Sequence, residues 1–176
     1  MKNTLSYSQS TYCFSLLKGG IPKTGLIGIQ GTLGSGKTEA VIQFLNENDK
    51  LKAVWVESEF NLYPQALGLQ GVSLERILFL ESSWVFWCVT QVLKSQIFQV
   101  AILYHDAFSE VELRRLQILA RQTQSLILLL QDTEKILSQV RWPFLLQLES
   151  RRTQVSSHPI LNILRSKNSE LWHAQI

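Results

Sequence analysis

The residues best suited to chemistry form a glycine-rich run, Gly31-Thr32-Leu33-Gly34-Ser35-Gly36-Lys37-Thr38, which matches the pattern G-x-x-x-x-G-K-[ST] in full. Glycines let such a backbone curl so that successive N–H groups point at phosphate oxygens. We expect the N–H groups of residues 33–37 to hold the phosphates, with Lys37 reaching the β- and γ-phosphates and the Thr38 hydroxyl binding Mg²⁺. The run therefore predicts a site for a nucleoside triphosphate such as ATP, and a glycine-rich turn without a ligand is the alternative.

A phosphate loop of this kind needs a strand before it and a helix after it. Residues 26–30 are an apolar run typical of a buried strand, and residues 36–46 follow a helical pattern. The N-terminus of that helix adds a positive dipole end beside the phosphates. The expected order of elements therefore fits the motif.

The rest of the chain alternates in the same way between short apolar runs and helical stretches. Further strands are expected at Ala53–Glu57, Arg76–Leu80, Val100–Tyr104, Leu126–Leu130, Phe144–Leu148 and Ile160–Leu164, and further helices at Tyr63–Leu69, Trp84–Lys94 and Glu110–Gln122. This alternation predicts an α/β fold with a mostly parallel sheet and helices on both faces. We expect one domain over residues 1–176.

Two carboxylates lie at the end of the expected strand 53–57. Glu57 and Glu59 are two residues apart, so in an extended chain both side chains would lie on one face. Ligands of parallel α/β sheets bind at the carboxyl ends of the strands. A glutamate at that edge can position and deprotonate an attacking water. A solvated strand end is the alternative that the spacing leaves open.

The expected strand 100–104 should supply the acidic partner of the magnesium. Typically four apolar residues are followed at once by Asp, but here Tyr104 follows them, then His105, and only then Asp106. Asp106 lies about 6–7 Å farther along than that position. It is a candidate metal ligand through water, and a degenerate acidic element is the alternative.

On these residues the chain resembles the RecA family of recombinase ATPases. The stretch GGIPKTGLIGIQGTLGSGKTEAV is similar to the family's first strand and phosphate loop, and residues 53–80 are similar to its second strand and catalytic-glutamate region. The resemblance covers about residues 10–150 and implies a RecA-like P-loop core. It implies that Glu59 is the catalytic base and that Gln131, which closes LILLLQ, senses the γ-phosphate.

The sequence is more similar still to the ImuA-type, SulA-like branch, whose members accompany mutagenic translesion polymerases. VWVESEFNLYPQALGLQGVSLERILFL and ELRRLQILARQ carry this likeness. It implies an accessory ATP-binding factor in DNA repair, recombination or the SOS-type damage response, with weak or no hydrolysis. Two alternatives stay open, an active DNA-dependent ATPase of recombinase type and a SulA-like cell-division inhibitor without enzymatic activity. The implied protein partner is a polymerase-type protein, RecA or a division protein, and single-stranded DNA is a further candidate ligand.

Several positions differ from the RecA family. Tyr63 stands where the family has Asp, Ala66 where it has an adenine-stacking Tyr, and Tyr104 where it has the metal aspartate. The base pocket must therefore be built differently. Nucleotide-gated binding of a repair partner fits these departures better than strand exchange in a filament.

Composition restricts the class of protein. The chain has 176 residues, of which 45% are hydrophobic and 18% charged, and this excludes an intrinsically disordered protein. No apolar run is long enough for a membrane span, and the first residues lack a signal pattern. We therefore expect a cytoplasmic protein without membrane contact.

The positive charge is concentrated at the end of the chain. Residues 1–134 carry a net charge of −1 and residues 135–176 a net charge of +4. This basic segment, from about residue 135, is a candidate contact with nucleic acid or an acidic partner, and a solvated face is the alternative. Of the aromatic residues, Trp142 and Trp172 lie in it, whereas Trp55, Trp84, Phe86 and Trp87 are expected in the core.

Overall fold

The structure is a computed structural model that describes residues 11–17, 19–105 and 107–132, together with the backbone of three later strands. Its main sheet contains β3 (Gly25–Gln30), β4 (Ala53–Glu57), β5 (Ile77–Glu81), β6 (Val100–Tyr104), β7 (Leu126–Gln131), β8 (Phe144–Ser150), β9 (Pro159–Ser166) and β10 (His173–Ala174). The helices are α1 (Lys37–Glu47), α2 (Pro64–Leu69), the 3₁₀ helix η2 (Leu74–Arg76), α3 (Val85–Lys94) and α4 (Glu110–Gln122). A small separate ribbon pairs β1 (Thr11–Tyr12) with β2 (Ile21–Pro22) in antiparallel orientation.

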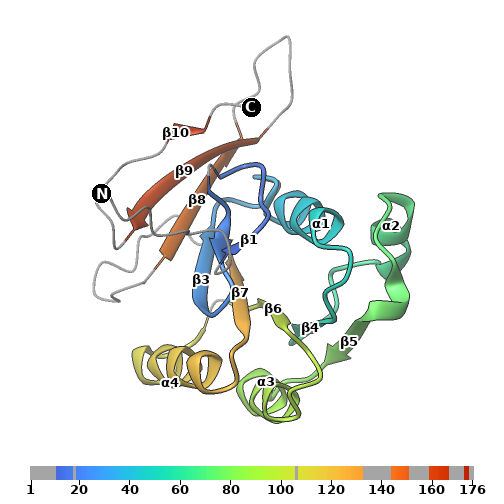
Figure 1. Cartoon of the computed structure of the whole chain (residues 1–176), viewed down its shortest axis with the longest axis vertical. Helices are drawn as coiled ribbons and strands as arrows, with labels where there is room; N and C mark the ends of the chain where they lie inside the picture. The colour runs from blue at the N-terminus through green and yellow to red at the C-terminus, as the bar shows by residue number, and fades with distance from the viewer. Residues whose placement is uncertain are drawn as a thin grey trace, which may run out of the picture.

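The strand order of the main sheet is β10-β9-β8-β3-β7-β6-β4-β5. The strands from β8 to β5 in this order are parallel to one another, whereas β9 is antiparallel to both β8 and β10. Helices α1 and α2 lie on one face of the sheet, and α3 and α4 lie on the other (Figure 1). The prediction of an α/β fold with a mostly parallel sheet covered on both faces is therefore confirmed.

The core has two layers, one on each side of the parallel strands. Trp55 of β4 packs in the layer beneath α1, where Phe44 and Leu45 are also fully buried. Val89 of α3 and Leu116 of α4 are fully buried in the opposite layer. All six residues of β7 are buried because this strand has neighbours on both edges and helices on both faces.

The aromatic expectation is wrong for two of its four residues. Trp55 is fully buried and Phe86 half-buried, but Trp84 is 74% and Trp87 59% exposed. The reason is the phase of α3, whose buried side chains Val85, Val89 and Leu93 recur every four residues. Trp84 precedes the first turn and Trp87 lies off the buried stripe.

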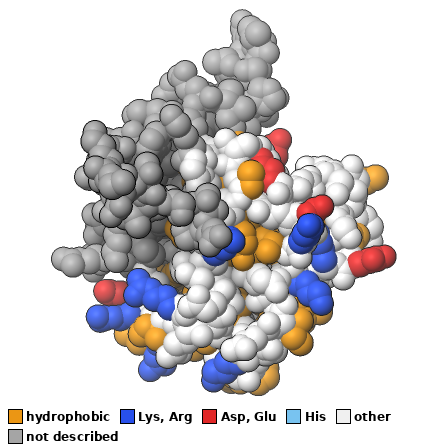
Figure 2. Space-filling model, in the orientation of Figure 1, with side chains coloured by type: hydrophobic (Ala, Val, Ile, Leu, Met, Phe, Trp, Pro, Cys, Tyr) orange, Lys and Arg blue, Asp and Glu red, His pale blue; other side chains and the backbone are white. Residues whose placement is uncertain are grey.

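Charged and hydrophobic side chains share the surface over α3 and α4. Figure 2 shows Lys and Arg side chains there, interspersed with exposed hydrophobic ones. The basic segment from about residue 135, with Trp142 and Trp172, lies outside the described residues apart from the backbone of β8, β9 and β10. The expectation about its partner therefore stays a prediction.

Two further expectations concern the whole chain. Within the ranges that the structure describes, no helix has both the length and the apolar character needed to cross a bilayer. The single domain over residues 1–176 stays a prediction.

Candidate functional site

The glycine-rich run forms the connection between β3 and α1, at the carboxyl edge of the parallel strands. Gly34 and Gly36 have φ angles of 77° and 90°, in the left-handed region that side chains disfavour. The Ser35 N–H donates to the Thr32 carbonyl at 3.1 Å, and the Ala40 N–H donates to the Gly36 carbonyl at 2.9 Å as the helix starts. The glycines therefore allow the loop to curl. The N–H groups in the first turn of α1 come before the first helical hydrogen bond, so they have no acceptor within the helix.

A pocket of about 580 Å³ lies against this loop. This volume lies within the range of small-molecule sites. Its lining combines the loop and first turn of α1 with residues from other parts of the sheet edge, namely residues 33–39, Ile42, Gln70, Tyr104 and Asp132. Of the loop residues predicted from the motif, Leu33–Thr38 line this cavity, and Gly31 is absent from its lining.

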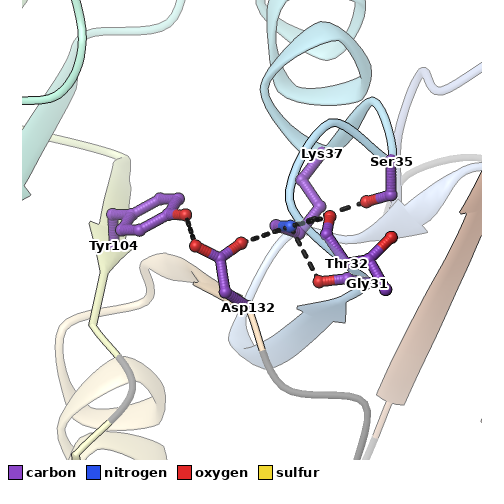
Figure 3. Close-up of polar contacts among 6 residues, drawn as sticks. All are labelled: Gly31, Thr32, Ser35, Lys37, Tyr104 and Asp132. Atoms are coloured by element: carbon purple, nitrogen blue, oxygen red, sulfur yellow. Dashed lines mark hydrogen bonds and ion pairs between the residues drawn. The ribbon is translucent and has the colours of Figure 1, made fainter.

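Lys37 is the buried cation of the site, with 4% of its side chain exposed. Its Nζ donates to the carbonyl oxygens of Gly31 at 2.8 Å and Thr32 at 2.7 Å, and it forms an ion pair with Asp132 Oδ1 at 2.6 Å (Figure 3). An ammonium group has three N–H donors. Two of the donors reach the loop carbonyls, Asp132 Oδ1 is held as an ion pair, and the Ser35 hydroxyl at 3.5 Å is a longer contact.

Asp132 contacts residues of two elements, α1 and β6, that lie far from it in the sequence. It follows β7 directly, and β7 lies between β3, which leads into the loop, and β6, which ends at Tyr104. Its second carboxylate oxygen accepts a hydrogen bond from the Tyr104 hydroxyl (Figure 3). Burial alone would raise the pKa of Asp132, but the hydrogen bonds from Lys37 and Tyr104 and the charge of Lys37 lower it below its ordinary value. The carboxylate is therefore ionised at neutral pH.

Asp132 is the site residue that the sequence reasoning missed. The available signal was its position directly after the apolar run Leu126–Leu130 and Gln131, the same pattern that was sought after residues 100–103. At the end of β6 the structure places Tyr104, and Asp106 lies outside the described residues. Tyr104 thus contributes to the site by orienting a carboxylate instead of supplying one.

A magnesium ion would find few protein ligands here. Among the described residues, no group of three or more His, Cys, Asp and Glu side chains could hold a metal ion. Nucleotide-bound Mg²⁺ usually keeps several waters and takes only one or two protein ligands besides the phosphates. Thr38 lines the pocket, so its hydroxyl fits a metal that arrives with a nucleotide.

Glu57 and Glu59 have different surroundings. Glu57 is 2% exposed, and its carboxylate accepts hydrogen bonds from Trp55 Nε1 at 2.7 Å and from the Asn61 N–H at 2.8 Å. Glu59 lies beyond the end of β4, is exposed and is absent from the lining of the pocket. Glu57 therefore organises the turn after β4, while Glu59 is the carboxylate that is accessible.

Gln131 lies directly behind the loop. It is fully buried, and its Oε1 accepts a hydrogen bond from Nε2 of Gln30, its register partner on β3, at 3.1 Å. Its backbone carbonyl accepts from the Gly31 N–H at 3.3 Å. Its side-chain Nε2 has no protein partner among the described residues. The predicted sensor residue is thus linked to the start of the loop and next to Asp132, outside the lining of the pocket.

Neither the protein-family models nor the curated proteins include a match to this sequence.

Proposed function

We propose that this protein binds a nucleoside triphosphate, ATP with Mg²⁺, in the pocket against residues 31–38, and that its sheet and helices form a RecA-like P-loop core. The observation that carries the proposal is the buried Lys37 ammonium inside a glycine-shaped loop that ends on a helix N-terminus. Such a loop offers backbone N–H donors, a dipole and a cation to the same anion. A phosphate chain is the ligand that uses all three.

Each residue has a defined task in this proposal. The N–H groups of residues 33–37 hold the phosphates, and Lys37 supplies the positive charge between the β- and γ-phosphates. The Thr38 hydroxyl binds the Mg²⁺, which when bound neutralises phosphate charge. Gln131, tied to Gly31 and Gln30, is suited to report the state of the loop to the segment that follows β7.

We further propose an accessory role in DNA repair or the SOS-type damage response, with weak or no hydrolysis. The resemblance to ImuA-type proteins suggests the role. Two features support slow hydrolysis. Tyr104 occupies the end of β6 where an aspartate would help to hold the metal, and the candidate base Glu59 lies outside the pocket.

Equilibrium binding tests the nucleotide site. We expect the wild-type chain to bind MgATP and the Lys37→Ala variant to lose that binding, because Lys37 is the only cation among the described residues that line the pocket. Lys50→Ala is the matched control, since Lys50 is an exposed lysine just beyond the far end of α1. Equal binding by wild type and the Lys37 variant would refute the site.

Turnover separates the accessory role from the recombinase alternative. We expect little phosphate release from MgATP, and no increase when single-stranded DNA is added. DNA-stimulated hydrolysis that is lost in both Lys37→Ala and Glu59→Gln would instead establish an active recombinase-type ATPase.

A further inference from the structure

The loop already holds an anion that belongs to the protein. Two of the three Lys37 contacts are with carbonyl groups of the loop itself, Gly31 and Thr32, and the third is with the Asp132 carboxylate. Asp132 is thus the charged partner of Lys37 in the described site, and it comes from a different strand. A phosphate oxygen that binds the Lys37 ammonium must take the place of at least one of these three contacts.

The carboxylate is the contact that a phosphate would replace. The carbonyl oxygens of Gly31 and Thr32 are part of the loop that surrounds the ligand, so they stay close to Nζ in any case. Asp132 lines the pocket in which the phosphates of the proposed ligand would lie, and both groups carry negative charge. Two anions beside one buried ammonium repel each other more strongly than they would in water.

Tyr104 holds the carboxylate in this competing position. Its hydroxyl donates to Oδ2, while Oδ1 pairs with Lys37, so the carboxylate is fixed from two sides (Figure 3). Tyr104 belongs to β6, and Lys37 begins α1, which follows β3; β6 and β3 are the two neighbours of β7, which Asp132 directly follows. Asp132 is therefore anchored by the sheet and does not depend on the loop alone.

We propose that Asp132 is a specificity-determining residue that competes with phosphate for Lys37, so that the site disfavours metal-free phosphates and favours a nucleotide whose charge a cation partly neutralises. Tyr104 acts through Asp132 as a positioning residue. This inference rests on the proposed nucleotide site and adds to it the rule by which that site selects ligands.

Binding of two probes to Asp132→Asn tests the inference. The probes are inorganic pyrophosphate in EDTA and ATP in millimolar Mg²⁺, both measured by calorimetry. The asparagine keeps the shape and removes the charge, and we expect metal-free pyrophosphate to bind about tenfold more tightly than to wild type. The gain for MgATP should be smaller, because the Mg²⁺ offsets part of the repulsion.

Asp49→Asn is the matched control. It makes the same chemical change at an exposed residue beyond the other end of α1, and we expect both affinities to stay at the wild-type values. A thermal unfolding curve of each variant without ligand establishes that the protein is folded. Unchanged or weaker pyrophosphate binding by folded Asp132→Asn would overturn the inference.

Tyr104→Phe tests the positioning role. Removing the hydroxyl should strengthen pyrophosphate binding in the same direction but by less than Asp132→Asn does. In the double variant the Tyr104 change should have no further effect, because the group it positions is already neutral. An equal effect of Tyr104→Phe with and without the Asp132 charge would show that Tyr104 contacts the ligand directly, and would overturn its assigned role.

The outcomes distinguish this inference from the proposed function. Suppose that MgATP binds to wild type and not to Lys37→Ala, and that Asp132→Asn binds both probes with wild-type affinity. In that case only the inference fails. If MgATP binds more weakly to Asp132→Asn while pyrophosphate binding is unchanged, the carboxylate serves the metal and the competition is refuted. If neither probe binds to wild type or to Asp132→Asn, the proposed nucleotide site itself fails, and the inference with it.

Discussion

Replacing Glu57 by alanine should destabilise the fold measurably, although Glu57 lies outside the nucleotide pocket. Its carboxylate accepts from Trp55 Nε1 at 2.7 Å, and Trp55 is fully buried in the layer beneath α1. Without an acceptor this indole N–H is left unpaired in the core, which costs about 1–3 kcal/mol. The second hydrogen bond, from the exposed Asn61 N–H, is replaced by water and contributes about 0.5–1 kcal/mol.

The expected loss for Glu57→Ala is therefore about 1.5–4 kcal/mol of unfolding free energy. For a chain of this size that corresponds to a decrease in Tm of roughly 3–16 °C. Glu57→Gln should lose only about 1 kcal/mol, because its amide oxygen can still accept from Trp55. Urea unfolding followed by far-UV circular dichroism measures both changes, and the slope of the transition should stay that of the wild type.

Glu59→Gln is the matched control for this series, since it makes the same change at the exposed carboxylate two residues away. It should stay within about 0.5 kcal/mol of wild type. MgATP binding by Glu57→Gln should match wild type as well, because Glu57 does not line the pocket. A loss below about 0.5 kcal/mol in Glu57→Ala would refute the reasoning from the buried indole.

Two further predictions concern helix ends. Arg76 donates to the carbonyl oxygens of Leu45 at 2.6 Å and Leu51 at 3.0 Å. Arg76→Met leaves these carbonyl groups without that donor and should lower the free energy of unfolding by about 2 kcal/mol, measured by calorimetry. An unchanged Tm would contradict this. Ser109 and Glu112 form a capping box on α4, and Ser109→Ala should cost about 1 kcal/mol near pH 7. Hydrogen bonds from Ser109 lower the pKa of Glu112, so this contribution is present above the ordinary glutamate pKa and is lost as the pH falls through the lowered value. Unfolding curves across acidic pH should therefore show the two proteins converging in part, because the Ser109 bond to the Glu112 carboxylate is lost while the Glu112 N–H bond to Ser109 Oγ does not titrate. A difference that stays fully constant would exclude the Glu112 carboxylate as one of its sources.

Much of the fold could be predicted because the local signals agree with each other. Buried strands such as β4 and β6 lack polar alternation, and their predicted bounds match the structure. Helix α4 has both a periodic apolar face and a capping signal, and it too was predicted with its observed bounds. The two-residue strands β1, β2 and β10 have too few residues to show any period.

The parts of the site that sequence reasoning missed depend on contacts between distant residues. Asp132 reaches Lys37 because β7 pairs with β3 on one side and β6 on the other, and strand order has no local signal in the sequence. The alternation rule that would place Glu57 and Glu59 on one face applies only within a strand. Because β4 ends at Glu57, the rule does not extend to Glu59. Gln131 lies next to the loop as the resemblance suggested, while its part in sensing phosphate stays a prediction.

The central claim is that the loop of residues 31–38 holds the phosphates of ATP, and residue-resolved NMR tests it most directly. MgATP is titrated into ¹⁵N-labelled protein, and the amide signals are followed. We predict that the largest shifts occur at Leu33–Thr38, with small ones on α4, and that Lys37→Ala abolishes them. Amide signals that do not change at millimolar MgATP, or shifts centred on α3 and α4, would contradict the account.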